Sequence, residues 1–127
     1  HIPSYEMRLE ILKKLISFSK PGAFVAINLW QFMNDDKLAA KAKDSTKQAL
    51  AYFDSHAEYE ALKDLQANDY FLSWDKQENI FRYCHHFDEQ EIEKLVKDVE
   101  NAQLISSYNA DGRNNELNRY LIFHNNY

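Results

Sequence analysis

The side chains best suited to chemistry gather between Trp74 and His85. Arg82 carries a guanidinium, which can grip a carboxylate with two parallel hydrogen bonds. Tyr83 and Trp74 offer aromatic faces on which a flat ring could stack. Each residue also has a plain structural alternative. Arg82 could pair with an acidic neighbour on the surface, and core burial is the alternative for Tyr83 and His85, which share one face of a strand opposite Arg82.

The run Cys84-His85-His86 raises the question of a metal site. Neighbours on a strand point to opposite faces, so at most Cys84 and His86 converge. Zinc takes four ligands, and no second pair stands nearby at a recognisable spacing. Nothing in the surrounding sequence marks the thiol of Cys84 as activated. We therefore predict neither a metal site nor cysteine catalysis.

Glycine is scarce in this chain, which has only Gly22 and Gly112. A dinucleotide or cofactor loop of the G-x-G-x-x-G kind needs several glycines close together. No such loop can be built here. The chain also starts at His1 rather than Met, directly before a helix entry. Together these features predict a chain that begins part-way through its fold.

The elements that must position these side chains begin with a helix and a strand. Pro3 and Ser4 predict a helix entry with Ser4 as N-cap, and Pro21-Gly22 ends the helix. Residues 23–30 (AFVAINLW) are nearly all apolar. That pattern is typical of a strand buried on both faces, as in a parallel sheet covered by helices. Residues 34–65 then predict two helices, the second with a capping box formed by Ser55 and Glu58.

The remaining segments predict two extended pieces, a helix and a hairpin. The extended pieces are 68–74 and 80–87, and Asp88 with Glu91 caps the next helix. Residues 103–108 and 118–123 predict an antiparallel hairpin. A helix, a buried strand and a second helix make half of a doubly wound sheet. The fold class is therefore α/β, with further parallel strands expected to lie outside this chain.

Bulk composition excludes several classes of protein. The net charge of -5 argues against a strongly basic nucleic-acid surface over the whole chain. One cysteine allows no intramolecular disulfide, and no apolar run reaches the roughly 18 residues of a membrane span. We expect a cytoplasmic protein without a membrane partner. One predicted helix carries four lysines, Lys37, Lys41, Lys43 and Lys47. We interpret them as a solvated helix face, and contact with an RNA backbone is the alternative.

The ordered phrases of the chain resemble class I S-adenosylmethionine-dependent methyltransferases. His1-Ile2-Pro3-Ser4 through Arg8 looks like the HHI or HHW phrase that follows the cofactor-binding half. Residues 15–30 (LISFSKPGAFVAINLW) resemble the family's LKPGG turn and following strand, and the last helix and hairpin look like its final elements. The resemblance implies a partial domain over 1–127, the C-terminal half of a Rossmann-like sheet with a helical insertion at about 34–66. It also implies S-adenosyl-L-methionine as cofactor, bound mostly by a missing N-terminal half.

A narrower resemblance joins one segment to the tRNA wobble-uridine carboxymethyl methyltransferases. NDYFLSW, RYCHHF and EQEIEKL are similar to that subgroup's GD-FVPW, RYYHLF and ELE run. The matching residues are Asp69, Phe71, Trp74, Arg82, Tyr83, His85 and Phe87. The departures are Asn68 for Gly, Leu72 for Val, Ser73 for Pro, Cys84 for Tyr and His86 for Leu.

This resemblance implies a site on the acceptor side of methyl transfer. A carboxymethyl acceptor already carries its nucleophilic carboxylate, so the protein needs a cation to orient it rather than a strong base. The expected substrate-binding residues are His1, Arg82, Tyr83, His85 and Trp74. The expected partners are tRNA and an activating protein.

Two other functions stay open at this point. The chain could be a non-catalytic half-domain that associates with a partner chain or with itself through an exposed sheet edge on residues 23–30. It could also be part of a small-molecule methyltransferase. An unrelated small α/β binding protein fits the ordered set of motifs poorly.

Overall fold

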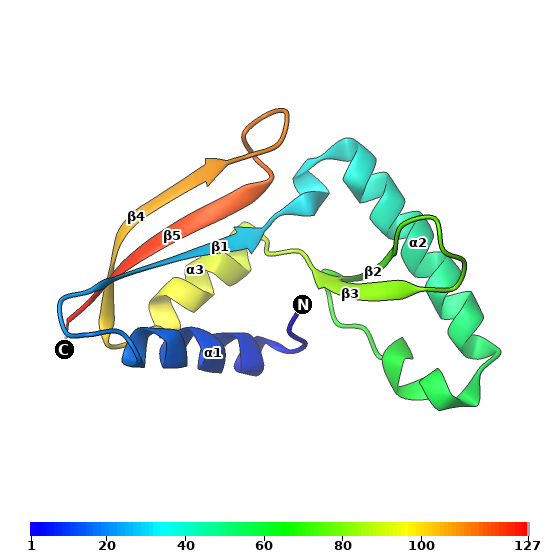
Figure 1. Ribbon diagram of the computed structural model, residues 1–127, viewed down its shortest axis with the longest axis horizontal. Coiled ribbons are helices and arrows are strands. Elements are labelled where there is room, and N and C mark those ends of the chain that lie inside the picture. Colours follow the sequence, from blue (N-terminus) through cyan, green and yellow to red (C-terminus); the bar gives the residue numbers. More distant parts are fainter. Residues whose placement is uncertain (127) are drawn as a thin grey trace. The chain divides into compact units, whose positions relative to one another are not determined.

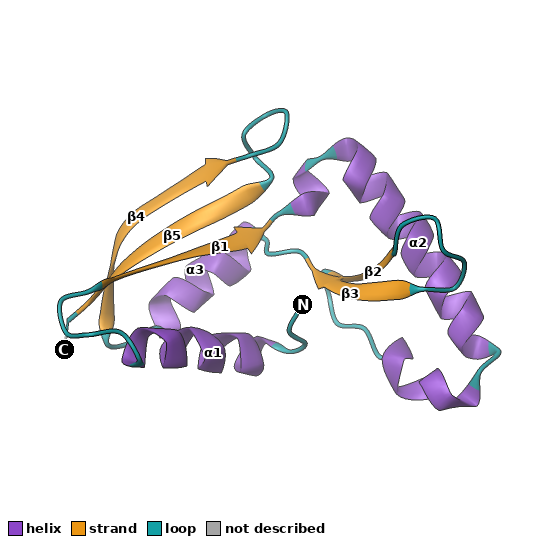
Figure 2. Cartoon of the chain, in the orientation of Figure 1, coloured by secondary structure: helices purple, strands orange, loops and turns teal. Residues whose placement is uncertain are grey.

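A computed structural model describes residues 1–126, which fold into two compact units. The first, called here the sheet unit, comprises Ile2–Gln31 and the chain from Phe87 onward. The second, called here the hairpin unit, comprises Phe32–His86 together with His1. Figure 1 traces both units along the chain, and Figure 2 marks their helices and strands.

The sheet unit contains two helices and three strands. The helices are α1 (Tyr5–Ser17) and α3 (Glu89–Asp98), and the strands are β1 (Phe24–Trp30), β4 (Ala102–Ala110) and β5 (Asn118–Asn125). The sheet order is β1-β5-β4, and β5 runs antiparallel to both neighbours. It follows that β1 and β4 run in the same direction, with a reversed strand between them. The expected terminal hairpin of β4 and β5 is confirmed.

Both helices of the sheet unit pack on one face of its sheet. The core joins side chains of α1, α3, β1 and β5, including Leu12, Leu29, Leu95, Leu121 and Phe123. These five side chains are at most 8 % exposed. Burying apolar side chains of this size is the main stabilising term of such a unit. The mixture of helices on an antiparallel sheet confirms the α/β class in its coarse form.

The expectation that residues 23–30 form a strand buried on both faces is wrong for the described residues. Alternate side chains of β1 are exposed, and Phe24 is 67 % accessible to solvent. The strand pairs antiparallel with β5, with Ile27 opposite Leu121. Val25, Ile27 and Leu29 face the core. An apolar sequence without alternation could not reveal which of its two faces is covered.

Local capping signals in the sheet unit are confirmed. The Ser4 side chain accepts a hydrogen bond from the Met7 amide, as the N-cap of α1. The Asp88 carboxylate accepts one from the Glu91 amide at 2.8 Å, as the N-cap of α3. Each cap satisfies an amide that has no partner within its helix.

The hairpin unit packs one long helix against a two-stranded hairpin. Its elements are the 3-10 turn η1 (Phe32–Asn34), helix α2 (Asp36–Asp54), the 3-10 segment η2 (Ala57–Lys63) and strands β2 (Asp69–Ser73) and β3 (Phe81–His85). The strands pair antiparallel. The buried cluster of this unit consists of Ala49, Phe53 and Phe71.

The prediction of a second α-helix in residues 34–65, capped by Ser55 and Glu58, is wrong. The segment Ala57–Lys63 is a 3-10 helix whose N-cap is His56, without a side-chain capping bond. Ser55 instead ends α2, and its hydroxyl bonds back to the Ala51 carbonyl. The pattern of a serine followed three residues later by a glutamate is short. It can therefore occur at the end of a helix as well as at its start. The start of α2 is capped by Asp35, which bonds the Leu38 amide.

No helix within the described residues is both long enough and apolar enough to cross a membrane.

Candidate functional site

Asp69 is the centre of a buried hydrogen-bond cluster in the hairpin unit. Its Oδ1 atom accepts a hydrogen bond from the Tyr83 hydroxyl at 2.6 Å and another from Nδ1 of His85 at 2.7 Å. Its Oδ2 atom accepts one from the Gln66 amide at 2.9 Å. The side chains of Asp69 and His85 are 6 % and 3 % exposed. The register of β2 and β3 places Asp69 opposite His85, which explains the contact.

This cluster fixes the orientation of the His85 ring. When Nδ1–H donates to a carboxylate, the other ring nitrogen is the one that can accept a proton or a hydrogen bond. The same carboxylate–imidazole arrangement orients histidines in many catalytic sites. The Asp69–Tyr83–His85 cluster can therefore hold an imidazole in one tautomer, in a position defined by two strands.

Arg82 and Trp74 form a second grouping on the hairpin. The Arg82 guanidinium carbon lies 5.2 Å from the centre of the Trp74 ring. Arg82 is opposite Leu72 in the register, one residue out of phase with Tyr83 and His85, so its side chain leaves the other face of the strand. Trp74 is 50 % exposed. This arrangement is a cation–π contact between the guanidinium and the indole.

The expected site residues are thus divided between two faces of β3. Tyr83 and His85 meet on one face, where Tyr83 also packs against the Phe71 cluster and His85 is buried, while Arg82 and Trp74 meet on the other. His1 is exposed and stands four residues before α1, and its contact with an acceptor stays a prediction.

Cys84 is fully buried, and burial raises the pKa of its thiol. A thiol whose pKa is raised is less nucleophilic at neutral pH, which gives this cysteine a structural role. Over residues 1–126 no group of three or more histidine, cysteine, aspartate or glutamate side chains is arranged to hold a metal ion.

Sequence reasoning missed a polar network at the end of β1. The side chain of Gln31, 1 % exposed, donates to the Phe87 carbonyl and to Glu89, and accepts from Asn109. Arg119 closes the ring by bonding Asn109 at 2.7 Å and both carboxylate oxygens of Glu89 at 2.6 and 2.7 Å. This network ties the end of β1 to the start of α3. The members of this network are far apart in the sequence, so no local pattern predicts it. The pairing of β4 with β5 places two of them, Asn109 and Arg119, opposite each other.

Arg8, the arginine of the opening phrase, is also structural in the sheet unit. It is 8 % exposed, pairs with Glu91 at 2.8 Å and donates to the Ile2 carbonyl at 2.9 Å. Its guanidinium carbon lies 5.8 Å from the centre of the Phe87 ring. These contacts join α1 to α3 and hold the segment that leads into α1.

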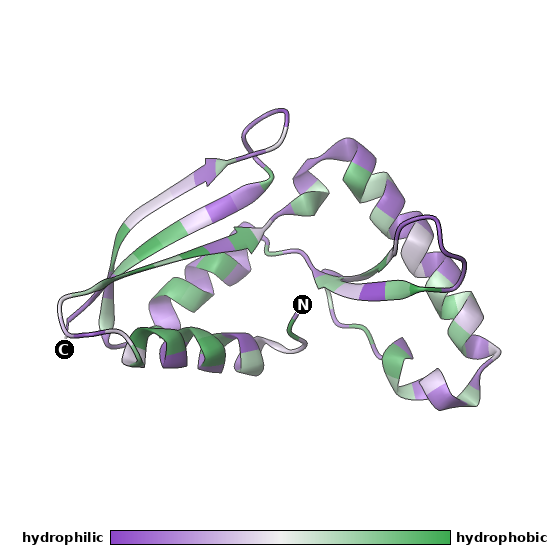
Figure 3. Ribbon diagram, in the orientation of Figure 1, coloured by the Kyte–Doolittle hydropathy of each residue, from purple (hydrophilic) through white to green (hydrophobic). Residues whose placement is uncertain are grey.

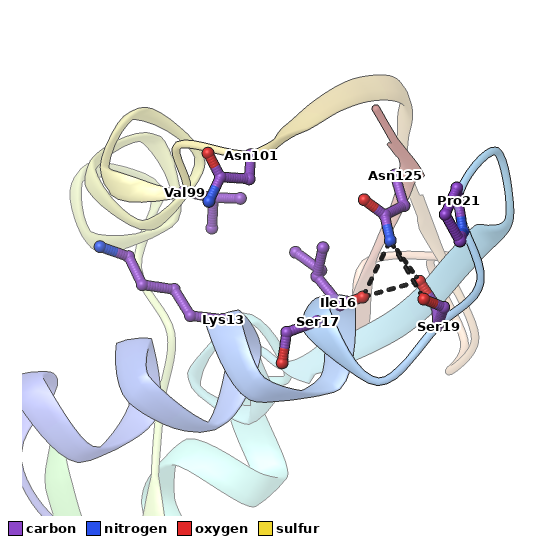
Figure 4. A pocket seen from close by; sticks show the side chains of 8 residues that line it. All are labelled: Lys13, Ile16, Ser17, Ser19, Pro21, Val99, Asn101 and Asn125. Carbon is purple, nitrogen blue, oxygen red and sulfur yellow. Dashed lines mark hydrogen bonds between the residues drawn. The ribbon is translucent and has the colours of Figure 1, made fainter. Parts of the chain in front are cut away.

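A cavity of about 380 Å³ lies at the opposite end of the sheet unit (Figure 4). It is lined by residues before β1, before β4 and at the end of β5, namely Lys13, Ile16, Ser17, Ser19, Pro21, Val99, Asn101 and Asn125. The Asn125 amide donates to the Ile16 and Ser19 carbonyls and to the Ser19 hydroxyl, as the dashed lines in Figure 4 show. In α/β sheets ligands bind outside the carboxyl ends of the parallel strands, and this cavity lies at the amino ends of β1 and β4. It is therefore not the candidate site.

The lysines of α2 are all exposed. Lys37, Lys41, Lys43 and Lys47 are exposed, and the exposed Asp36 and Asp44 stand directly beside Lys37 and Lys43 in the sequence. Alternating charge of this kind is typical of a solvated helix face.

Comparison with known proteins gives one informative match. No family model matches the chain, and no curated protein matches it. The structure is similar to the crystal structure of a S-adenosylmethionine-dependent methyltransferase from Methanosarcina mazei, with a TM-score of 0.60 at 15% sequence identity. The match covers 97% of this chain and 53% of that one, so the chain spans about half the length of that protein. The chain therefore shares the fold of part of a S-adenosylmethionine-dependent methyltransferase.

Proposed function

We propose that this chain forms the acceptor-side, C-terminal half of a S-adenosylmethionine-dependent methyltransferase. The observation that carries the proposal is the fold match to the Methanosarcina mazei methyltransferase over 97% of the chain. The opening phrase, the PGA turn before β1 and the reversed strand β5 support it in the order expected for such enzymes. The terminal hairpin supports it as well.

The residues of this chain do not by themselves fit the cofactor. Gly22 precedes β1 and Gly112 lies between β4 and β5, with φ angles of 77° and 75°. Neither follows a strand and opens a helix, which is what a glycine-rich cofactor loop requires. S-adenosyl-L-methionine would therefore be held mainly by residues outside these 127.

For the acceptor we propose a carboxymethyl group on a tRNA wobble uridine. Arg82, stacked on Trp74, would grip the carboxylate, and Trp74 would offer a face to the base. The buried Asp69–His85 pair lies on the opposite face of β3 and would fix the strand that presents Arg82. Asn68 adds support, because it stands where the resembled subgroup has glycine and adopts a φ of 66°. Glycine adopts that left-handed conformation readily, and asparagine tolerates it better than most residues. An activating protein partner belongs to the same proposal.

Titration with 5-carboxymethyluridine tests the acceptor. We expect shifts in the NMR signals of the Trp74 indole and of the Arg82 guanidinium, and weaker or no shifts with plain uridine. Arg82→Gln should weaken binding by at least about tenfold, because it removes a charge-assisted bidentate contact. Lys76→Gln is the matched control, since Lys76 is exposed in the β2–β3 connection of the same hairpin. Equal binding of uridine and carboxymethyluridine would refute the acceptor.

The gene upstream of the His1 codon tests the half-domain proposal separately. We expect it to encode a strand, a glycine-rich turn and an acidic residue roughly 20 positions further on. A start codon immediately before His1 would contradict a single-chain enzyme.

A further inference from the structure

The hairpin unit contains a cavity of about 210 Å³, called here the aromatic cavity. The described residues that line it are Tyr52, Phe53, Tyr59, Leu62, Phe71, Asn79, Ile80 and Phe81. All of them belong to the hairpin unit, so the walls of the cavity are formed without the sheet unit and without residues outside this chain. Figure 3 shows hydrophobic and hydrophilic stretches alternating along α2 and η2, which supply much of the lining.

Aromatic rings form most of the walls of the aromatic cavity. Phe53 and Phe71 are 6 and 5 % exposed, and their ring centres lie 5.1 Å apart in the core of the unit. Tyr52, Tyr59 and Phe81 are only half-buried. The rings of Tyr59 and Phe81 lie 5.5 and 6.0 Å from the ring of Phe53. The buried pair therefore anchors the wall, and the half-buried rings give it accessible aromatic surface.

Neighbouring groups hold the tyrosines of this wall in position. The His56 imidazole stacks on Tyr52 with the ring centres 4.1 Å apart, and its Nδ1 atom donates a hydrogen bond to the Tyr52 carbonyl at 2.8 Å. The Tyr59 amide donates to the His56 carbonyl at 3.0 Å, and its ring centre lies 6.0 Å from that of Tyr52. Groups that are ordered in advance lose less conformational freedom when a ligand binds.

The charge around the aromatic cavity is predominantly negative. Exposed carboxylates stand directly beside lining residues in the sequence, namely Asp54, Glu58, Glu60 and Glu78. The Lys63 ammonium pairs with Asp54 at 2.6 Å and with Glu60 at 3.2 Å, so two carboxylates share it. Arg82 leaves the other face of β3, where it lies against Trp74. Summed charge of one sign around a cavity raises the local concentration of ions of the opposite sign, here cations.

We propose that the aromatic cavity binds a small quaternary ammonium ion such as choline. The face of an aromatic ring attracts a cation placed over it, and quaternary ammonium ions are recognised by aromatic-lined sites of this kind. The polar groups of the described lining residues are the Asn79 amide and the hydroxyls of Tyr52 and Tyr59. An ammonium ion with N–H groups would give up hydrogen bonds to water on entering, whereas a fully methylated one has none to give up. The cavity volume of about 210 Å³ suits an ion of this size better than a nucleotide. This binding is independent of the methyl transfer proposed above.

NMR titration of the 127-residue chain with choline tests this site. The matched probe is the neutral analogue of choline in which carbon replaces the nitrogen, because it keeps the shape and removes the charge. We expect choline to shift the ring protons of Tyr52, Tyr59 and Phe81, and to bind at least about tenfold more tightly than the neutral analogue. Tyr59→Leu should weaken choline binding by at least about fivefold, because it removes one ring from the wall. Tyr108→Leu is the control, since Tyr108 is 47 % exposed on β4 of the sheet unit.

Nuclear Overhauser contacts in the parent chain keep the test valid if Tyr59→Leu fails to fold. We expect them between the N-methyl protons of choline and the ring protons of Tyr59 and Phe81, and their absence at saturating choline overturns the proposal. Equal affinity for choline and its neutral analogue overturns it as well, because the rings would then make no use of the charge. So does a choline affinity that a folded Tyr59→Leu leaves unchanged, or the lack of any binding up to roughly tens of millimolar.

Discussion

Asp69 joins three hydrogen-bond donors inside the hairpin unit. It accepts hydrogen bonds from a tyrosine hydroxyl, an imidazole and a backbone amide, and its side chain is 6 % exposed. A buried carboxylate is tolerated when donors surround it in this way. Tyr83 and His85 both bond the same carboxylate oxygen, so Asp69 links the two side chains.

We expect Asp69→Asn to destabilise the chain by about 1–3 kcal/mol, because an amide group would replace oxygens that now face three donors. Urea unfolding followed by circular dichroism measures the change. Asp75→Asn is the control, since Asp75 is exposed in the β2–β3 connection. Equal unfolding midpoints for the two variants would show that the cluster contributes nothing to stability.

At the scale of elements, polar side chains join the two helices of the sheet unit. Tyr5 of α1 donates a hydrogen bond from its hydroxyl to the Asp98 carboxylate of α3 at 2.7 Å. The Lys94 ammonium lies 3.4 Å from the centre of the Tyr5 ring. The hydrogen bond from Tyr5 is the main reason that the pKa of Asp98 lies below its usual value. Contact between α1 and α3 is therefore linked to pH.

The sign of that linkage follows from the direction of the shift. A carboxyl whose pKa is lower in the folded state contributes stability above its unfolded pKa, near 3.9, and loses it as pH falls through the folded value. We expect Tyr5→Phe to raise the pKa of Asp98, seen by NMR titration of its carboxyl carbon. The stability difference between the parent and Tyr5→Phe should be larger at neutral pH than in acid. Tyr108→Phe, an exposed tyrosine on β4, should leave that pKa unchanged. A pH-independent difference would refute the linkage.

At the scale of the whole molecule, the chain shares the fold of about half of a methyltransferase without a cofactor loop of its own. We expect calorimetry to detect no binding of S-adenosyl-L-methionine to the 127 residues, because no glycine-rich turn offers backbone amides at a helix start. The heat of mixing with S-adenosyl-L-methionine should equal the heat of dilution. Micromolar binding would contradict the proposed division between donor and acceptor halves.

The sequence by itself determined most of the local structure. Ser4 and Asp88 identified two helix starts, and two nearby extended segments joined by a polar connection predicted the terminal hairpin, because these signals act over a few neighbouring residues. The same local signal failed at Ser55, where a capping pattern stands at the end of a helix instead. The alternation of side chains along a strand correctly predicted that Tyr83 and His85 lie opposite Arg82.

Only the tertiary structure decided which partners these elements meet. The antiparallel pairing of β1 with β5, the bond between Asp69 and His85, and the network of Gln31, Glu89 and Arg119 all join residues distant in the chain. Such contacts depend on topology and register, which a single apolar run such as FVAINLW does not specify. The sequence thus predicted that Arg82 and His85 lie on opposite faces of their strand, whereas their partners, Trp74 for Arg82 and Asp69 for His85, followed from the fold.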